Sequence, residues 1–171
     1  MKFLLTAIVM LFLPFLLSAP SLAFTGGENY IWVSEDLGVS YSKIGYLHQD
    51  QKFIKVTSET TNGGLRSSFD LSFGSDILSF GDSLRARSGL YGEVGVNSSS
   101  GLSFLFGTGI KYISSASNFM LSAGTKYYIR EKRLVYDAMA FIRVLPPLTL
   151  NFGYDDLYRS KIFIGLGLQF K

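Results

Sequence analysis

Residues 119–130 have the sequence FMLSAGTKYYIR, in which the chemistry of the side chains alternates from one position to the next. Phe119 and Leu121 begin one face, whereas Ser122 and Lys126 lie on the opposite face. Successive side chains of a β-strand point to opposite sides of the sheet. The stretch therefore predicts a strand whose two faces meet different surroundings.

The same period of two recurs along most of the chain, and short polar connections separate the repeats. Each connection contains Gly, Pro, Asn, Asp, Ser or a cluster of charges, as turns do. Connections this short join only neighbouring antiparallel strands, so the chain predicts an up-and-down meander without helices. We predict about ten strands, with eight as the alternative, at residues 37–47, 52–60, 65–73, 77–86, 89–97, 101–113, 118–130, 133–144, 147–156 and 159–170.

A meander must protect its two edge strands, and closure into a barrel does so. The polar face indicates which side is outside, because it holds only about one or two charges per strand among many Gly and Ser residues. So few charges are unusual for a surface exposed to water, but they suit the inner face of a narrow lumen. We therefore predict an all-β, up-and-down antiparallel transmembrane β-barrel with its apolar side chains outside. A soluble lipocalin-like barrel, with the two faces reversed, is the alternative.

The composition favours one compact domain. The chain has 171 residues, of which 47% are hydrophobic and 17% charged, and its formal net charge is +3. A disordered chain would be more polar. The absence of cysteine from the sequence excludes disulfide scaffolds, thiolate metal sites and an acylated amino-terminal cysteine. We expect no cofactor and no nucleic-acid partner.

Residues 1–23 have the layout of a cleaved secretory signal peptide. Lys2 precedes an apolar run, and Ser21 and Ala23 have the spacing that signal peptidase recognises, so we expect cleavage after Ala23. A retained helical anchor is the alternative, although Pro14 shortens the apolar run below the roughly 20 residues that a spanning helix needs.

The segment after the signal peptide shows the weakest alternation. We predict residues 24–36 to be a short lead-in or an extension of the first strand, and residues 37–171 to be a single barrel domain. Trp32 is interpreted as an interfacial anchor, with ordinary packing as the alternative.

The predicted inward face indicates a lumen filled by side chains. Small inward glycines leave room for the large inward residues Tyr91, Tyr128, Phe141 and Phe163. Inward charges are expected to pair in a ladder, because an unpaired buried charge costs several kcal/mol. The ladder would join Asp70, Glu93 and Asp137 to Lys111, Lys126 and Arg143. A proton or ion path through the lumen is the alternative.

Residues suited to catalysis are sparse. The single histidine, His48, lies beside Gln49 and Asp50 in a predicted turn, where a solvated side chain is expected. A metal cluster built on imidazoles is excluded, and a Ser-His-Asp arrangement would have to use His48. We therefore predict a protein that is not an enzyme.

The last predicted strand carries the most specific resemblance. Its sequence from Gly165 through Leu168 to Phe170 alternates apolar residues after a glycine and ends in an aromatic. This pattern is similar to the carboxy-terminal signal that the barrel assembly machinery recognises, although Lys171 follows Phe170. The whole mature chain resembles small Gram-negative outer-membrane barrels of the size class of OmpX and the OmpA amino-terminal domain. The resemblance implies an outer-membrane location. The lipid A deacylase barrels use a His and a Ser two residues apart, whereas here Asp50 follows His48.

Basic connections suggest one partner. If both chain ends lie on the periplasmic side, the connections at the outer end are 48–51, 74–76, 97–101, 131–133 and 156–160. Two of them are basic, since Arg130, Lys132 and Arg133 cluster at one tip, and Arg159 and Lys161 cluster at the next. Guanidinium groups bind phosphate as forked donors, so we hypothesise a contact with lipopolysaccharide phosphate. Two solvated turns are the alternative.

The predicted function is that of a non-catalytic integral outer-membrane barrel with a structural or loop-mediated role. A narrow ion or small-solute channel, a lipid-modifying outer-membrane enzyme and the soluble barrel remain alternatives. The oligomeric state is not predicted.

Overall fold

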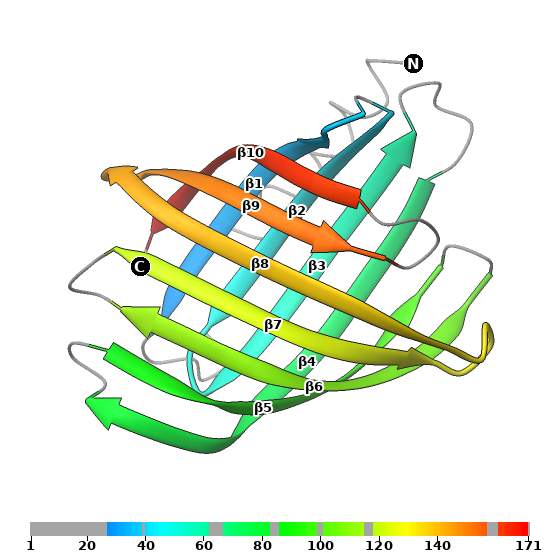
Figure 1. The fold of residues 1–171 in the computed structure, drawn as a ribbon, viewed down its shortest axis with the longest axis horizontal. Helices are drawn as coiled ribbons and strands as arrows, with labels where there is room; N and C mark the ends of the chain where they lie inside the picture. Colours follow the sequence, from blue (N-terminus) through cyan, green and yellow to red (C-terminus); the bar gives the residue numbers. More distant parts are fainter. Residues whose placement is uncertain are drawn as a thin grey trace, which may run out of the picture.

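The computed structural model of the protein describes residues 27–38, 40–61, 67–82, 86–98, 101–114, 118–156 and 161–170, which contain ten β-strands (Figure 1). The strands are β1 (Glu28–Asp36), β2 (Tyr41–Gln49), β3 (Lys52–Thr61), β4 (Ser67–Asp82), β5 (Ala86–Asn97), β6 (Ser103–Ser114), β7 (Phe119–Tyr128), β8 (Arg133–Leu145), β9 (Leu148–Asp155) and β10 (Lys161–Phe170). The predicted signal peptide, Arg159 and Lys171 lie outside the described residues.

The strands close into one barrel in which each strand pairs antiparallel with its neighbours in the chain. The barrel closes where β1 pairs with β10, from Asn29 opposite Phe170 to Asp36 opposite Phe163 (Figure 1). Closure gives both terminal strands a hydrogen-bonded partner. The prediction of an all-β, up-and-down antiparallel barrel of ten strands is confirmed.

Strand β1 corrects the predicted lead-in. It pairs with β2 as well as with β10, so it is a full member of the barrel, which begins at Glu28 and not at residue 37. Its alternation is hidden because both faces are apolar here: Trp32 is 3% exposed and lies in the lumen, whereas Val33 is 52% exposed on the outside. The interpretation of Trp32 as an interfacial anchor is therefore wrong.

Strand β4 corrects a second prediction. It runs through residues 74–76, which the sequence predicted to be a turn. Its register with β5 shifts between Asp76 and Leu78. A bulge of this kind changes the phase of the alternation without reversing the chain, and so resembles a turn in the sequence. The number of strands stays at ten, because β1 adds one strand while two predicted strands, 65–73 and 77–86, merge into β4.

The two faces of the barrel have opposite chemistry. Phe104 and Phe106 are 62% and 53% exposed, whereas Leu105 between them is 3% exposed. Strands β1 and β4 to β10 each carry at least one exposed large apolar side chain, and we call this surface the outer belt. The predicted placement of apolar side chains outside is thus found in the structure.

The barrel has two distinct ends. The terminus end holds Glu28 and Phe170 and the connection at 146–147, whereas the loop end holds the connections at 98–102 and 129–132. The predicted outer connection at 48–51 lies at the terminus end instead. Strand β1 runs from the terminus end to the loop end, so the antiparallel strand β2 returns to the terminus end. No helix long and apolar enough to span a membrane occurs in the described part of the chain.

Candidate functional site

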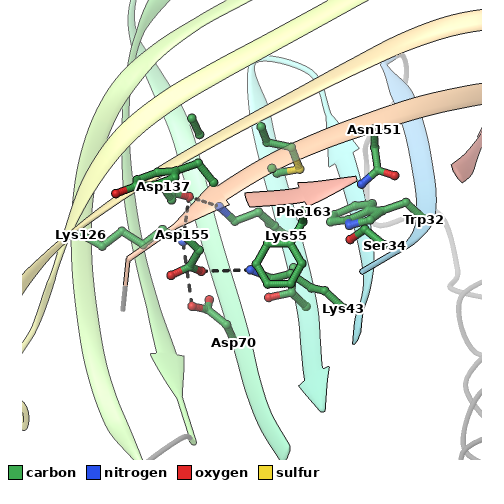
Figure 2. A pocket seen from close by; sticks show the side chains of 15 residues that line it. Trp32, Ser34, Lys43, Lys55, Asp70, Lys126, Asp137, Asn151, Asp155 and Phe163 are labelled. Atoms are coloured by element: carbon green, nitrogen blue, oxygen red, sulfur yellow. Dashed lines mark hydrogen bonds and ion pairs between the residues drawn. The ribbon is translucent and has the colours of Figure 1, made fainter. Parts of the chain in front are cut away.

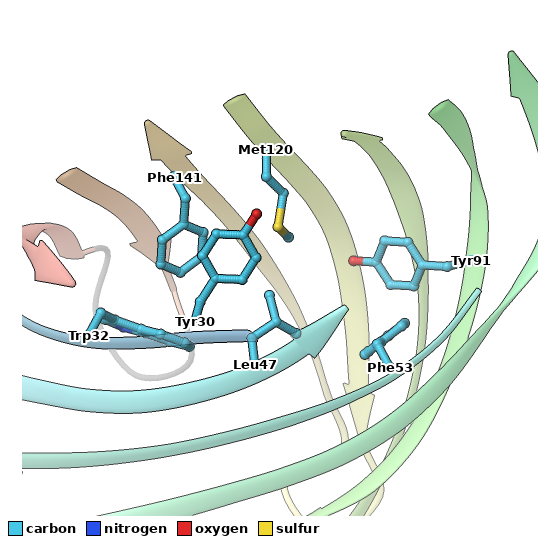
Figure 3. Packing of buried hydrophobic residues seen from close by; sticks show 7 residues of the cluster. All are labelled: Tyr30, Trp32, Leu47, Phe53, Tyr91, Met120 and Phe141. Atoms are coloured by element: carbon cyan, nitrogen blue, oxygen red, sulfur yellow. The ribbon is translucent and has the colours of Figure 1, made fainter. Parts of the chain in front are cut away.

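The lumen holds an apolar cluster that spans the barrel (Figure 3). Its buried members are Tyr30, Trp32, Leu47, Phe53, Tyr91, Met120 and Phe141. Phe141 of β8 lies 4.6 Å from Tyr30 and 5.1 Å from Trp32 of β1, measured between ring centroids. Phe53 of β3 meets Tyr91 of β5 edge to face at 5.3 Å. Rings from strands that are not neighbours therefore fill the space between them.

Two of these rings pack directly against glycines of the barrel wall. A Cβ at Gly45 would overlap the indole of Trp32, and a Cβ at Gly124 would lie 2.5 Å from the hydroxyl oxygen of Tyr91. The predicted role of inward glycines as space for large side chains is visible at these positions. Of the four predicted inward aromatics, Tyr91, Tyr128, Phe141 and Phe163 are all at most 4% exposed.

Charged side chains form a central cluster around Lys126 of β7. The Lys126 ammonium lies 3.3 Å from Asp137 of β8, and 3.9 Å from both Asp70 of β4 and Glu93 of β5. Lys55 of β3 is a second cation, 3.1 Å from Asp137 (Figure 2). Five strands thus contribute charges to this cluster, and opposite charges offset the cost of burial there.

Tyr128 supports this cluster from the side. Its hydroxyl donates to the Oδ2 atom of Asp70 at 2.9 Å, and Tyr128 is only 2% exposed. The tyrosine fixes one carboxylate oxygen, so that Asp70 has a hydrogen bond in addition to its ionic contact with Lys126.

A second network lies toward the loop end. Lys43 of β2 lies 3.0 Å from Asp155 of β9 and 4.0 Å from Glu59 of β3. Lys161 of β10 also pairs with Glu59, and its ammonium lies 3.7 Å above the ring centroid of Tyr41. These contacts join β2 and β3 to β9 and β10 across the loop end of the lumen.

A third network lies toward the terminus end. Lys111 of β6 pairs with Asp76 of β4, and its ammonium donates to the carbonyl oxygen of Asp50 at 2.9 Å. Arg87 of β5 lies 3.4 Å from the Asp50 carboxylate and 3.9 Å from that of Asp76. Ion pairs thus occur at three levels of the lumen.

The structure divides the six residues of the predicted ladder. Asp70, Glu93, Lys126 and Asp137 meet in the central cluster, whereas Lys111 belongs to the terminus-end network. Within the described ranges, Arg143 of β8 forms no ion pair with any of the other five. The side chains face the lumen as expected, but the stagger of the strands places them at different heights, and so they do not form one ladder.

Seven charged partners of these networks were missed by the sequence interpretation. They are Lys43, Asp50, Lys55, Glu59, Asp76, Arg87 and Asp155. The sequence did contain a signal for some of them, because they occupy positions that alternate with outward apolar residues. Lys55, for example, lies between Ile54 and Val56 on β3.

The predicted basic rim is only partly available to a ligand. Lys161 is 8% exposed and paired with Glu59 inside the lumen, so its assignment to the rim is wrong. The Nη2 atom of Arg133 donates to the carbonyl oxygen of Asp156 at 2.5 Å. Arg130 and Lys132 are exposed beside the loop end. Lys161 was misassigned because it is the first residue of β10 and its side chain turns inward.

The residues of the predicted assembly signal lie in the closing strand β10. A Cβ at Gly165 would overlap the carbonyl oxygen of Val33, so this glycine permits close approach of β1. Leu168 is 48% exposed on the outer belt, and the Phe170 carbonyl accepts a hydrogen bond from Asn29 Nδ2 at 3.3 Å. Recognition of these residues by an assembly machinery stays a prediction.

His48 lies within β2 and not in a turn, with its Nδ1 atom 2.9 Å from Asn29 Oδ1. The side chain is 7% exposed, which corrects the expectation of a solvated histidine. Across the described ranges, no group of three or more His, Cys, Asp and Glu residues is arranged to hold a metal ion.

Two small cavities lined by described residues lie within the lumen. The larger has a volume of about 40 Å³ and adjoins the central cluster (Figure 2). The smaller has a volume of about 10 Å³ and adjoins the apolar cluster. A cavity needs roughly 10–15 Å³ to hold one water, so these spaces suit water molecules and nothing larger.

These features define a closed, ten-stranded antiparallel β-barrel with an apolar outer belt and a lumen filled by rings and ion pairs. No known protein family and no curated protein matches the sequence. A solved structure from the de novo design of transmembrane β-barrels aligns with a TM-score of 0.42 and 16% identity, covering 84% of this chain and 93% of that chain. A triple mutant of the Rhodopseudomonas blastica porin aligns with a TM-score of 0.36 and 10% identity, covering 85% of this chain and 52% of the porin. The chain spans about half the length of that porin. The fold assignment rests on the strand pairing itself.

Proposed function

We propose that this protein is an integral β-barrel of a Gram-negative outer membrane, with a closed lumen and a non-catalytic, structural or loop-mediated role. The observation that carries the proposal is the inversion of its two faces. Phe106 is 53% exposed on the outside, whereas Lys126 is 4% exposed in the interior. A continuous apolar surface around most of a barrel far exceeds the patches of a few hundred Å² that soluble proteins tolerate. Lipid is the solvent that such a surface fits.

The strand lengths support the same environment. Strand β1 has 9 residues and β10 has 10, and a membrane-spanning strand needs roughly 9–11 residues. Aromatic side chains also lie toward both ends of the outer belt, such as Tyr112 toward the terminus end and Phe104 toward the loop end. Aromatic girdles at the two interfaces are typical of outer-membrane barrels.

The contents of the lumen support a closed barrel. The apolar cluster and the three ion-pair networks occupy the space that a porin keeps open for water. Because buried charges are stable only when paired, the networks resist the separation that an open pore would require. Export through a cleaved signal peptide and insertion by the barrel assembly machinery complete the proposal.

Lipopolysaccharide is the proposed partner at the loop end. Arg130 and Lys132 are the exposed cations that support it. If the loop end faces the cell exterior, these side chains lie at the depth of the glycolipid phosphates.

Two measurements on the purified full-length protein test this proposal. The band on an unboiled detergent gel should shift on boiling, because a closed barrel resists unfolding until it is heated. In planar bilayers the protein should give no large, stable conductance. Reproducible porin-like steps would overturn the closed lumen, and an unshifted band from a protein found in the periplasm would favour the soluble barrel.

The second candidate function is that of a narrow channel. The two water-sized cavities favour it, because they lie at two levels of the lumen and charged side chains line part of each. The side chains between the two cavities would then decide what crosses the lumen.

A further inference from the structure

The two cavities of the lumen are neighbours that share part of their walls. Lys55 of β3 and Met139 of β8 line both of them. The larger cavity lies on one side with Asp137 and Asn151, and the smaller lies on the other side with Tyr91 and Lys111. The side chains of Lys55 and Met139 therefore lie between the two cavities, and we call this pair the partition.

The larger cavity is lined by polar atoms that suit bound water. Ser34 Oγ, Asp70 Oδ1, Asp137 Oδ1 and Asn151 Oδ1 are buried and have no hydrogen-bond partner among the described residues. All four residues line this cavity, and Ser34 and Asn151 are at most 2% exposed (Figure 2). Buried waters form two to four hydrogen bonds each, and a cavity of about 40 Å³ has room for roughly two or three of them.

Polar residues continue from this cavity to the loop end. Lys43 and Asp155 line it and belong to the loop-end network. The side chains of both residues are still partly open to solvent, at 16% and 21% exposure. Water at the loop end is thus one ion pair away from the cavity.

The smaller cavity is connected in the same way to the terminus end. Gln49 and Lys111 line it, and both donate a hydrogen bond to the carbonyl oxygen of Asp50. The Asp50 side chain is 37% exposed. Polar groups therefore extend from solvent at each end as far as the partition.

We propose that the lumen contains an interrupted file of water molecules, and that the partition is what stops protons from crossing the barrel. This inference rests on the proposed function, because it requires a closed barrel that spans a membrane. Lys55 is held in place by its ion pair with Asp137 at 3.1 Å, and Met139 fills the remaining width with a flexible apolar side chain. The permeant species on either side is water or a proton, since the cavities have no space for a hydrated ion.

The test compares two methionines that differ in the number of cavities they line. Met139 lines both cavities, whereas Met120 lines the smaller cavity alone. Met139→Ala should join the two spaces, and Met120→Ala should enlarge one of them without opening the partition. Full-length protein is reconstituted into liposomes that contain a pH-sensitive dye, and proton entry is followed under an imposed potassium diffusion potential.

We expect wild-type protein and Met120→Ala to be as tight as empty liposomes, and Met139→Ala to admit protons severalfold faster. Conductance in potassium chloride should stay absent in all three. Lys55→Ala is a second opening variant, so the partition remains testable if Met139→Ala gives no heat-shifted band.

The possible outcomes distinguish failure of the partition from failure of the proposed closed barrel. Proton entry through the wild-type protein would contradict the closed lumen itself. A tight wild type together with equal rates for Met139→Ala, Lys55→Ala and Met120→Ala would overturn the partition and leave the closed barrel intact.

Discussion

The outer belt and the lumen of this barrel lie on opposite sides of the same strands and obey opposite rules. On β10, Leu166 is 56% exposed to the outside, whereas Phe163 is 1% exposed inside. The belt is uniform and its residues make few specific contacts, so lipid or any apolar medium can satisfy it. The lumen is specific, because each charge needs a partner at a given height. The difference teaches that location is encoded by the belt, and closure by a small number of contacts in the lumen.

The largest expected effect comes from breaking the central cluster. Lys126→Met leaves Asp70, Glu93 and Asp137 with Lys55 as their remaining cation, which should lower the free energy of unfolding by about 3–5 kcal/mol. Urea unfolding in vesicles, followed by the fluorescence of Trp32, the single tryptophan of the chain, measures the loss.

The control for this substitution removes a charge of opposite sign. Lys126→Met combined with Glu93→Gln should recover part of the loss, because fewer carboxylates then lack a cation. A loss of only about 0.5 kcal/mol, typical of surface substitutions, would show that the cluster does not stabilise the lumen.

The next effect comes from placing a charge on the belt. Leu166 lies between Val33 and Leu150 of the flanking strands, near the middle of β10. Leu166→Arg should cost about 2–4 kcal/mol in a bilayer, which is the range for a cation at the midplane of a barrel. Unfolding in vesicles measures it, with Leu166→Ala as the matched control. Equal stability of the two variants would place Leu166 in water.

A smaller effect is expected from filling the space under a ring. Gly45→Ala would push against the Trp32 indole and should cost about 1–3 kcal/mol, as overpacking does. Gly153→Ala is the matched control, because its Cβ would meet Phe163 Cβ at an ordinary 3.6 Å. Comparable losses at both glycines would contradict the role assigned to Gly45.

The smallest effect concerns the loop end. Arg130→Gln combined with Lys132→Gln should lower thermal stability slightly in membranes that contain lipopolysaccharide, and hardly at all in neutral detergent. Lys52→Gln, an exposed cation at the other end, is the control. The same loss in both media would remove lipopolysaccharide as a partner.

The sequence predicted the belt better than the lumen, for a physical reason. Alternation on a single strand is enough to place Phe104 outside and Leu105 inside. Contacts inside the lumen depend on which strands face each other and on their stagger, which no single strand encodes. The pairs of Lys55 with Asp137 and of Lys161 with Glu59 join residues 82 and 102 positions apart, and both were missed. The tight fit of Trp32 over Gly45 was hidden for the same reason.

The most direct test of the inverted barrel compares tryptophans on its two faces. Brominated acyl chains quench only the tryptophans that touch the hydrocarbon. In vesicles of brominated lipid, wild-type Trp32 should keep its fluorescence, whereas Leu166→Trp in a Trp32→Phe background should be strongly quenched. Quenching of Trp32 together with an unquenched Leu166→Trp would contradict the assignment of the two faces.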